Sequence, residues 1–182
     1  MPLLTWPKIT CSIMAVLGVM AIGLRLLNTV PGYLSPPPLQ TYATLEEAGR
    51  STGVHFYTPA YYPDYLQWPP YDIRGWVQPQ KKVAVTLALQ DSRRPVLWLE
   101  EWYPVPGEAL PSIPRAAQLV EKKTVSLHEG VEAQMVAYKS SGDQLYYRLI
   151  WDEGNTRVAM TALLPPSELL HMAMNMRPLA SY

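Results

Sequence analysis

The chain has one cysteine, Cys11, and a single cysteine cannot form a disulfide within the chain. A folded domain built from this sequence must therefore be stabilised by side-chain packing, even in an oxidising compartment. Cys11 lies inside a run of apolar residues, so we interpret it as a small buried apolar side chain.

The chain also has little charge and no excess of either sign. Its 15 lysines and arginines balance its 15 aspartates and glutamates, and charged residues make up only 16% of the sequence. Proteins that bind nucleic acid or anionic surfaces through charge carry a basic patch or stripe. The composition therefore argues against nucleic acid as a partner.

Motifs of the common catalytic sites are absent as well. The sequence has no G-x-S-x-G motif, no glycine-rich phosphate loop and no H-E-x-x-H motif, and no cofactor is predicted. One hydrolase hypothesis rests on Glu100, because flanking indoles from Trp98 and Trp102 can raise the pKa of a carboxyl and make it a proton donor. The adjacent Glu101 points to the opposite strand face and cannot act with it.

What the sequence has instead is a long apolar run near its amino terminus, Ile9 to Leu24, without a charged residue. Extended to Val30, the run has roughly 22 residues, which as a helix measure about 33 Å and can cross a hydrocarbon core of about 30 Å. Arg25, near its end, can reach the headgroups along its methylene stem. We therefore predict a transmembrane anchor over residues 1–30.

Two features of this segment bear on where the rest of the chain lies. Ala21-Ile22-Gly23 offers small residues to a signal peptidase, so a cleaved signal peptide is the alternative, although the apolar residues that follow favour a retained anchor. Lys8 and the terminal amine place more positive charge before the apolar run than Arg25 places after it. This difference favours an amino terminus on the cytoplasmic side. We predict a single-pass protein of the cytoplasmic membrane with its C-terminal domain on the extracytoplasmic side. Its partners would be the membrane and other membrane proteins.

The rest of the chain divides into a linker, residues 31–43, and one domain, residues 44–182. The linker is rich in proline, which favours an extended and semi-rigid spacer. The remaining length suits a single domain with its own hydrophobic core.

Hydrophobic patterns predict an α+β fold for this domain. Thr44 and Glu47 form a capping box that predicts a helix from Leu45 to Ser51, ending at Gly53. A second helix is predicted to begin at the cap Ser167 and to end before Pro178. Between the helices the sequence predicts an antiparallel sheet of about six or seven strands. The predicted strands cover residues 54–57, 82–90, 96–103, 120–127, 131–138, 144–151 and 156–163.

Beyond its first strand, the proline-rich segment 54–76 is predicted to be irregular, because proline does not fit a central strand. Its many aromatic rings can cover one side of the sheet or form a platform for a sugar, a peptide or an apolar ligand. The strand 96–103 adds two indoles on one face. The candidate binding residues are Tyr61, Tyr62, Tyr65, Trp68, Tyr71, Trp76, Trp98 and Trp102.

Residues 171–176 contain the candidate metal ligands His171, Met172 and Met176, since imidazole and thioethers suit Cu(I). In a helix Met172 and Met176 share a face while Met174 points away, so we favour methionines that fill the core. The other two histidines, His55 and His128, are isolated in sequence and predict no zinc site.

Several short motifs are spread over residues 45 to 176. They are Glu47-Ala48, Gly53-Val54, Pro59, Tyr62-Pro63-Asp64-Tyr65-Leu66, Leu149-Ile150-Trp151, Glu153-Gly154 and Glu168-Leu169-Leu170. In these motifs the chain resembles bacterial extracytoplasmic domains that follow a single membrane anchor, a group similar in layout to half-barrel domains of the RseB and LolA type. The resemblance implies a concave apolar groove that binds lipid or lipoprotein segments.

Taken together, these features predict a membrane-anchored, noncatalytic extracytoplasmic domain that serves as an accessory or interaction subunit of a membrane protein complex. A lipid-binding or lipoprotein-binding half-barrel is one alternative. A hydrolase that uses Glu100 is the other.

Overall fold

The computed structural model describes residues 40–77, 80–107, 114, 116–128 and 130–179, together with Gly18, Met20 and Arg25. Every helix and strand named below belongs to the compact unit Pro38–Tyr182. Within the described ranges, no helix combines the length and apolar character that crossing a bilayer requires. Apart from the three single residues, the predicted anchor 1–30 lies outside these ranges.

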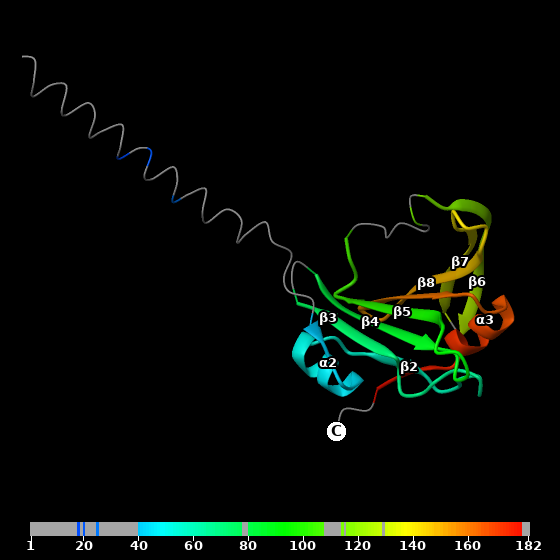
Figure 1. Cartoon of the computed structure of the whole chain (residues 1–182), viewed down its shortest axis with the longest axis horizontal. Helices are drawn as coiled ribbons and strands as arrows, with labels where there is room; N and C mark the ends of the chain where they lie inside the picture. The colour runs from blue at the N-terminus through cyan, green and yellow to red at the C-terminus, as the bar shows by residue number, and fades with distance from the viewer. Residues whose placement is uncertain are drawn as a thin grey trace, which may run out of the picture. The chain divides into compact units, whose positions relative to one another are not determined.

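An antiparallel sheet of eight strands forms the framework of the domain (Figure 1). From one edge to the other its strands are β1 (Gln40–Thr41), β3 (Asp72–Trp76), β4 (Lys81–Ala88), β5 (Pro95–Tyr103), β9 (Thr156–Ala162), β8 (Leu145–Glu153), β7 (Val131–Lys139) and β6 (Gln118–His128). A separate ribbon pairs β2 (Tyr57–Pro59) with β10 (Met176–Pro178). Strands β6 to β9 form a meander whose last strand pairs with β5, so two distant parts of the chain meet in the middle of the sheet.

The structure confirms an α+β fold dominated by an antiparallel sheet, but the predicted number of strands is wrong. In the described residues the sheet has eight strands rather than about six or seven, and two further strands form a separate ribbon. Strand β3 lies in the segment predicted to be irregular, and β1 lies in the predicted linker 31–43. Both are short and lack an alternating apolar pattern, so pairing with a neighbouring strand, rather than local sequence, makes them strands.

Helix α2 (Leu45–Thr52) begins at the predicted capping box. The Glu47 amide donates to Thr44 Oγ1 at 3.1 Å, and the Glu47 carboxylate accepts from the Ala43 amide at 3.1 Å. Gly53, with φ 68°, ends the helix in the left-handed region that glycine tolerates best. The prediction is confirmed at both ends, with one more helical residue than expected.

Helix α3 (Pro166–Met174) does not begin and end where the sequence predicted. Its N-cap is Pro165, which makes no side-chain hydrogen bond, so the prediction of Ser167 as the cap is wrong. The helix ends at Asn175, whose side-chain amide donates to a carbonyl of the last turn at 2.8 Å. Pro178 instead belongs to strand β10.

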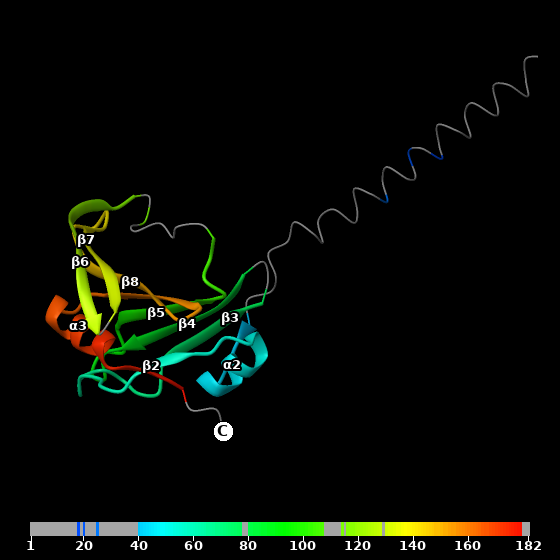
Figure 2. The same ribbon diagram turned by 180° about the vertical axis from the view of Figure 1, so that it is seen from behind.

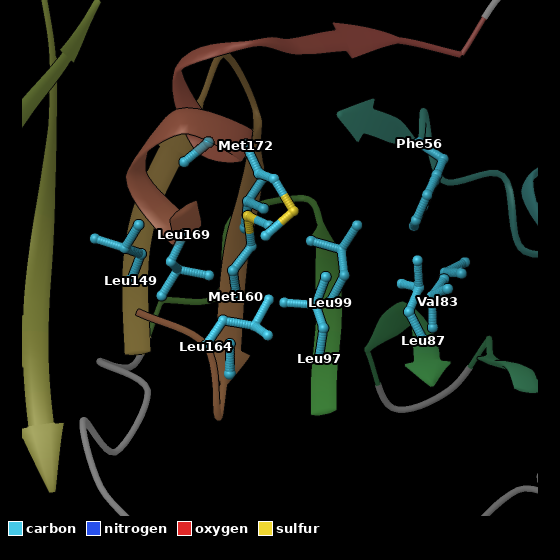
Figure 3. Packing of buried hydrophobic residues seen from close by; sticks show 14 of the residues in the cluster. Phe56, Val83, Leu87, Leu97, Leu99, Leu149, Met160, Leu164, Leu169 and Met172 are labelled. Atoms are coloured by element: carbon cyan, nitrogen blue, oxygen red, sulfur yellow. The ribbon is translucent and has the colours of Figure 1, made fainter. Parts of the chain in front are cut away.

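Both described helices pack on the same face of the sheet. Helix α2 contacts β3 and β4, while α3 contacts β6, β8 and β9 (Figures 1 and 2). In Figure 3, Leu169 and Met172 of α3 lie against Met160, and all three side chains are fully buried. We call this the helix-covered face, and we call the opposite side the open face, because no described helix packs there.

Gly75 lies where β3 passes close to α2. A Cβ atom at this position would lie 2.7 Å from Tyr42 Cε2 and 2.8 Å from Thr52 Cγ2. Carbon atoms prefer separations of about 3.5–4.0 Å, so Gly75→Ala must displace the ring or the end of the helix. We expect the substitution to lower the free energy of unfolding by about 1–3 kcal/mol in urea titrations. Gly142→Ala is the control, since its Cβ would meet only Ser140 Oγ at 3.8 Å; an equal loss in both variants would contradict this account.

Candidate binding site on the open face of the sheet

The predicted binding residues do not gather at one place. Trp76, Trp98 and Trp102 lie on the open face, where Trp76 and Trp102 are both register partners of Lys82 in β4. The remaining candidates belong to the loop between β2 and β3: Tyr61, Tyr62, Tyr65, Trp68 and Tyr71. The structure therefore separates the aromatic candidates into two groups.

In the loop group, two rings are part of the packing of the domain. The Tyr61 ring packs against His171 of α3 in a tilted arrangement, with centroids 4.2 Å apart, and Tyr62 packs against Trp68 in the same way at 4.7 Å. Tyr61 and Tyr62 both pack against the hydrophobic core. Burial, assisted by the nearby Glu101, raises the pKa of Tyr62. These rings hold the loop against the sheet and α3, whereas Tyr65, Trp68 and Tyr71 keep much of their surface exposed.

The candidate metal ligands lie in three different environments. Met172 is fully buried in the core, His171 is exposed and contacts the Tyr61 ring, and Met176 is half-buried in β10. Across the described ranges, no group of three or more His, Cys, Asp or Glu side chains has the arrangement to hold a metal ion.

On the open face, charged side chains from β4, β5 and β8 form a chain that passes over β9, which lies between β5 and β8. Lys82 Nζ of β4 lies 2.5 Å from Glu100 Oε1 of β5, and Arg148 Nη2 of β8 lies 3.5 Å from Glu100 Oε2. The Lys82 ammonium also lies over the rings of Trp76 and Trp102, 4.9 Å and 4.7 Å from their centroids. The open face thus combines indoles with partly desolvated charges, and this combination favours cation–π contacts.

Beside this chain lies a pocket with a volume of about 420 Å³, which we call the open-face pocket. Its walls come from β5, β7, β8, β9 and the segment before β6. The lining residues are Trp98, Glu100, Pro114, Ala116, Ala117, Tyr138, Ser140, Ser141, Tyr146, Arg148 and Thr161. Most of this lining is apolar, and the volume falls within the range of about 300–1,000 Å³ that is usual for ligand pockets.

The register of the sheet explains why a hollow forms here. Thr161 of β9 is the register partner of both Trp98 and Arg148, so a small residue lies between two large ones. On the other side of the pocket, Tyr138 and Tyr146 stack almost parallel, with centroids 5.3 Å apart and an angle of 6°. The large side chains therefore surround the small side chain of Thr161, which forms the bottom of the pocket.

Arg148 is the least satisfied polar group of the pocket. Its side chain is only 13% exposed, and its Nε is buried without a hydrogen-bond partner in the described part of the chain. Its ion pair with Glu100 is long at 3.5 Å, while Glu100 is held more closely by Lys82. A buried guanidinium that is only partly paired retains capacity to bind an acceptor.

Sequence reasoning singled out Glu100 but did not single out its neighbour Glu101. Glu101 is fully buried on the helix-covered face, and both of its carboxyl oxygens accept from the Tyr57 amide, at 3.0 and 3.1 Å. Burial raises the pKa of Glu101 well above its ordinary value. The signal was present in the sequence, because a period of two places Glu101 on the same strand face as Leu97 and Leu99.

Comparison with known proteins provides no assignment for these features. Neither a protein-family model nor a curated protein sequence matches this chain.

Proposed function

We propose that this protein is a membrane-anchored, noncatalytic extracytoplasmic domain that binds a partner through the open-face pocket. It acts as an accessory or interaction subunit of a membrane protein complex. The observation that carries the proposal is the pocket itself, where aromatic rings surround a partly paired arginine on a face that no described helix covers.

The residue types of the pocket favour a protein partner. Tryptophan, tyrosine and arginine are the side chains most enriched among the residues that dominate binding energy at protein interfaces. Trp98 and Tyr146, with centroids 6.0 Å apart, are both only half-buried and so retain surface for a partner to cover. Such rings gain binding energy when a partner removes water from them.

The geometry favours binding over acid catalysis by Glu100. A general acid must present its carboxyl to the bond that it protonates. Both oxygens of Glu100 are instead engaged by cations, one by Lys82 and the other by Arg148. The carboxylate thus orients these two cations within the open face.

The packing of the helix-covered face also bears on the lipid-binding alternative. The side of the sheet that faces the helices is filled by the domain's own side chains, including Leu99, Met160 and Leu169 (Figure 3). On the described part of the sheet, the open-face pocket is therefore the site that a lipid chain would share with a protein partner, and one experiment at this pocket distinguishes the two.

Site-specific photo-crosslinking of the full-length protein in its native membranes tests the proposal. A photoreactive phenylalanine analogue in place of Ser141, an exposed residue of the pocket lining, is expected to form a discrete protein adduct. The same analogue at Ser51, an exposed residue of α2, is the control and is expected to form none. The adduct at Ser141 should disappear when Trp98→Ala is added. A lipid adduct would support the alternative, and equal adducts at both positions would contradict the proposal.

A further inference from the structure

We infer that the open-face pocket selects a carboxylate carried on an apolar body the size of one or two amino-acid residues. This inference rests on the proposed binding role and specifies the chemistry of the group that is bound. It follows from the charge balance, the incomplete pairing of one cation and the shape of the walls.

Among the described residues, the chain of charged side chains formed by Lys82, Glu100 and Arg148 carries one positive charge in excess, and its Glu100 and Arg148 line the pocket. Lys82 and Glu100 neutralise each other at 2.5 Å, which leaves the guanidinium of Arg148 as the excess charge. A neutral ligand would leave this excess charge in place while it removed water from it, at a cost in free energy. A ligand with a single negative charge compensates the excess charge.

The geometry of Arg148 favours a carboxylate over a single acceptor atom. A guanidinium is planar and binds carboxylates through two parallel hydrogen bonds. In the protein, Arg148 makes one long contact to Glu100, from Nη2, while its Nε has no hydrogen-bond partner in the described ranges. A small rotation of the guanidinium toward the pocket would replace this weak contact to Glu100 with two parallel hydrogen bonds to a ligand carboxylate.

The walls determine what accompanies the carboxylate. Trp98, Tyr138 and Tyr146 present ring surface, and Ala116 and Ala117 present methyl groups from the segment before β6. The lining also includes Ser140 and Ser141, two hydroxyl-bearing residues of the turn that follows β7. An apolar group is therefore expected beside the charged one. The volume of about 420 Å³ limits this group to a small side chain or a short acyl chain.

Two kinds of molecule carry this chemistry: the C-terminal residue of a polypeptide and a fatty acid. Both have one carboxylate on an apolar body. The protein-partner proposal favours the polypeptide, and the experiment below includes a matched pair of probes for each source.

Calorimetric titration of the full chain in nanodiscs tests the inference. The first probes are the peptide acetyl-Ala-Ala-Leu with a free carboxylate and the same peptide as its C-terminal amide. The second pair is hexanoate and hexanamide. We expect each acid to bind at least about tenfold more tightly than its amide, because only the acid compensates and pairs with the guanidinium.

Variants separate recognition of the charge from support of the fold. Arg148→Met should abolish the difference in affinity between acid and amide. Arg148→Lys should reduce that difference several-fold, because lysine keeps the positive charge but cannot form the two parallel hydrogen bonds of a guanidinium. Glu100→Gln removes the competing carboxylate and should tighten binding of the acid by about three- to tenfold without changing that of the amide. A merely structural role for these residues would not strengthen binding. Arg177→Met, at an exposed position in β10, is the control and should leave all affinities unchanged.

The outcomes also separate this inference from the proposed function. Equal binding of acid and amide would overturn selection of a carboxylate while leaving the pocket as a binding site. Absence of binding by all four probes would overturn the inference, and a protein adduct at Ser141 would still support the protein partner. Tighter binding of hexanoate than of the peptide acid would assign the carboxylate to an acyl chain.

Discussion

Met172→Ala is expected to lower the free energy of unfolding by about 2–5 kcal/mol, the range typical of methionine truncations in a core. The side chain is 0% exposed, and it lies among Leu169 and Met160 where α3 meets the sheet (Figure 3). Removing the thioether leaves a void that these neighbours can fill only in part. Urea unfolding monitored by circular dichroism measures the loss.

Two further variants distinguish packing from metal binding. Met172→Leu keeps the volume and should cost less than about 1.5 kcal/mol. Met174→Ala, at a side chain that is 52% exposed, should cost almost nothing. If Met172 were a Cu(I) ligand, leucine would be as harmful as alanine and the loss would vanish in the presence of a copper chelator. Either result would contradict the packing interpretation.

Glu101→Gln is expected to stabilise the protein, and to do so increasingly as the pH rises. Burial raises the pKa of Glu101 well above its ordinary value of 4.5, so the folded state keeps a proton that the unfolded state releases. The folded state thus binds more protons above pH 4.5, and stability falls as the pH rises from there to the folded-state pKa. For one proton the slope is at most about 1.4 kcal/mol per pH unit. Glutamine has no proton to lose and can still accept the hydrogen bond from Tyr57.

Thermal unfolding at a series of pH values between 4 and 8 provides the measurement. The melting temperatures of the two proteins should be closest at pH 4 and should separate as the pH rises, with the glutamine variant higher. Glu132→Gln, at an exposed position of β7, is the control and should follow the unaltered protein at every pH. A glutamine variant that is less stable at pH 8 would show that the folded state stabilises the ionised carboxyl.

Helix α3 shows which features helical periodicity predicts and which it does not. Helical spacing correctly predicted that Met172 fills the core, because side chains three and four apart share a helix face. The ends of α3 were predicted less well. A proline serves as N-cap without a side-chain hydrogen bond, and the segment after Asn175 leaves the helix to pair with β2. That pairing depends on a partner strand over 100 positions earlier in the chain, and no local pattern encodes it.

Local sequence determined those features of this protein that depend on near neighbours. The capping box at Thr44, the stop at Gly53 and the two faces of β5 follow from hydrogen bonds and side-chain directions within a few residues. Tertiary structure alone decided that Glu100 and Arg148 meet, because β9 pairs with both β5 and β8 and thereby brings two distant strands to one open face. The pocket and the incomplete pairing of Arg148 depend on that arrangement, since ion pairing and exclusion of water are properties of neighbours in space.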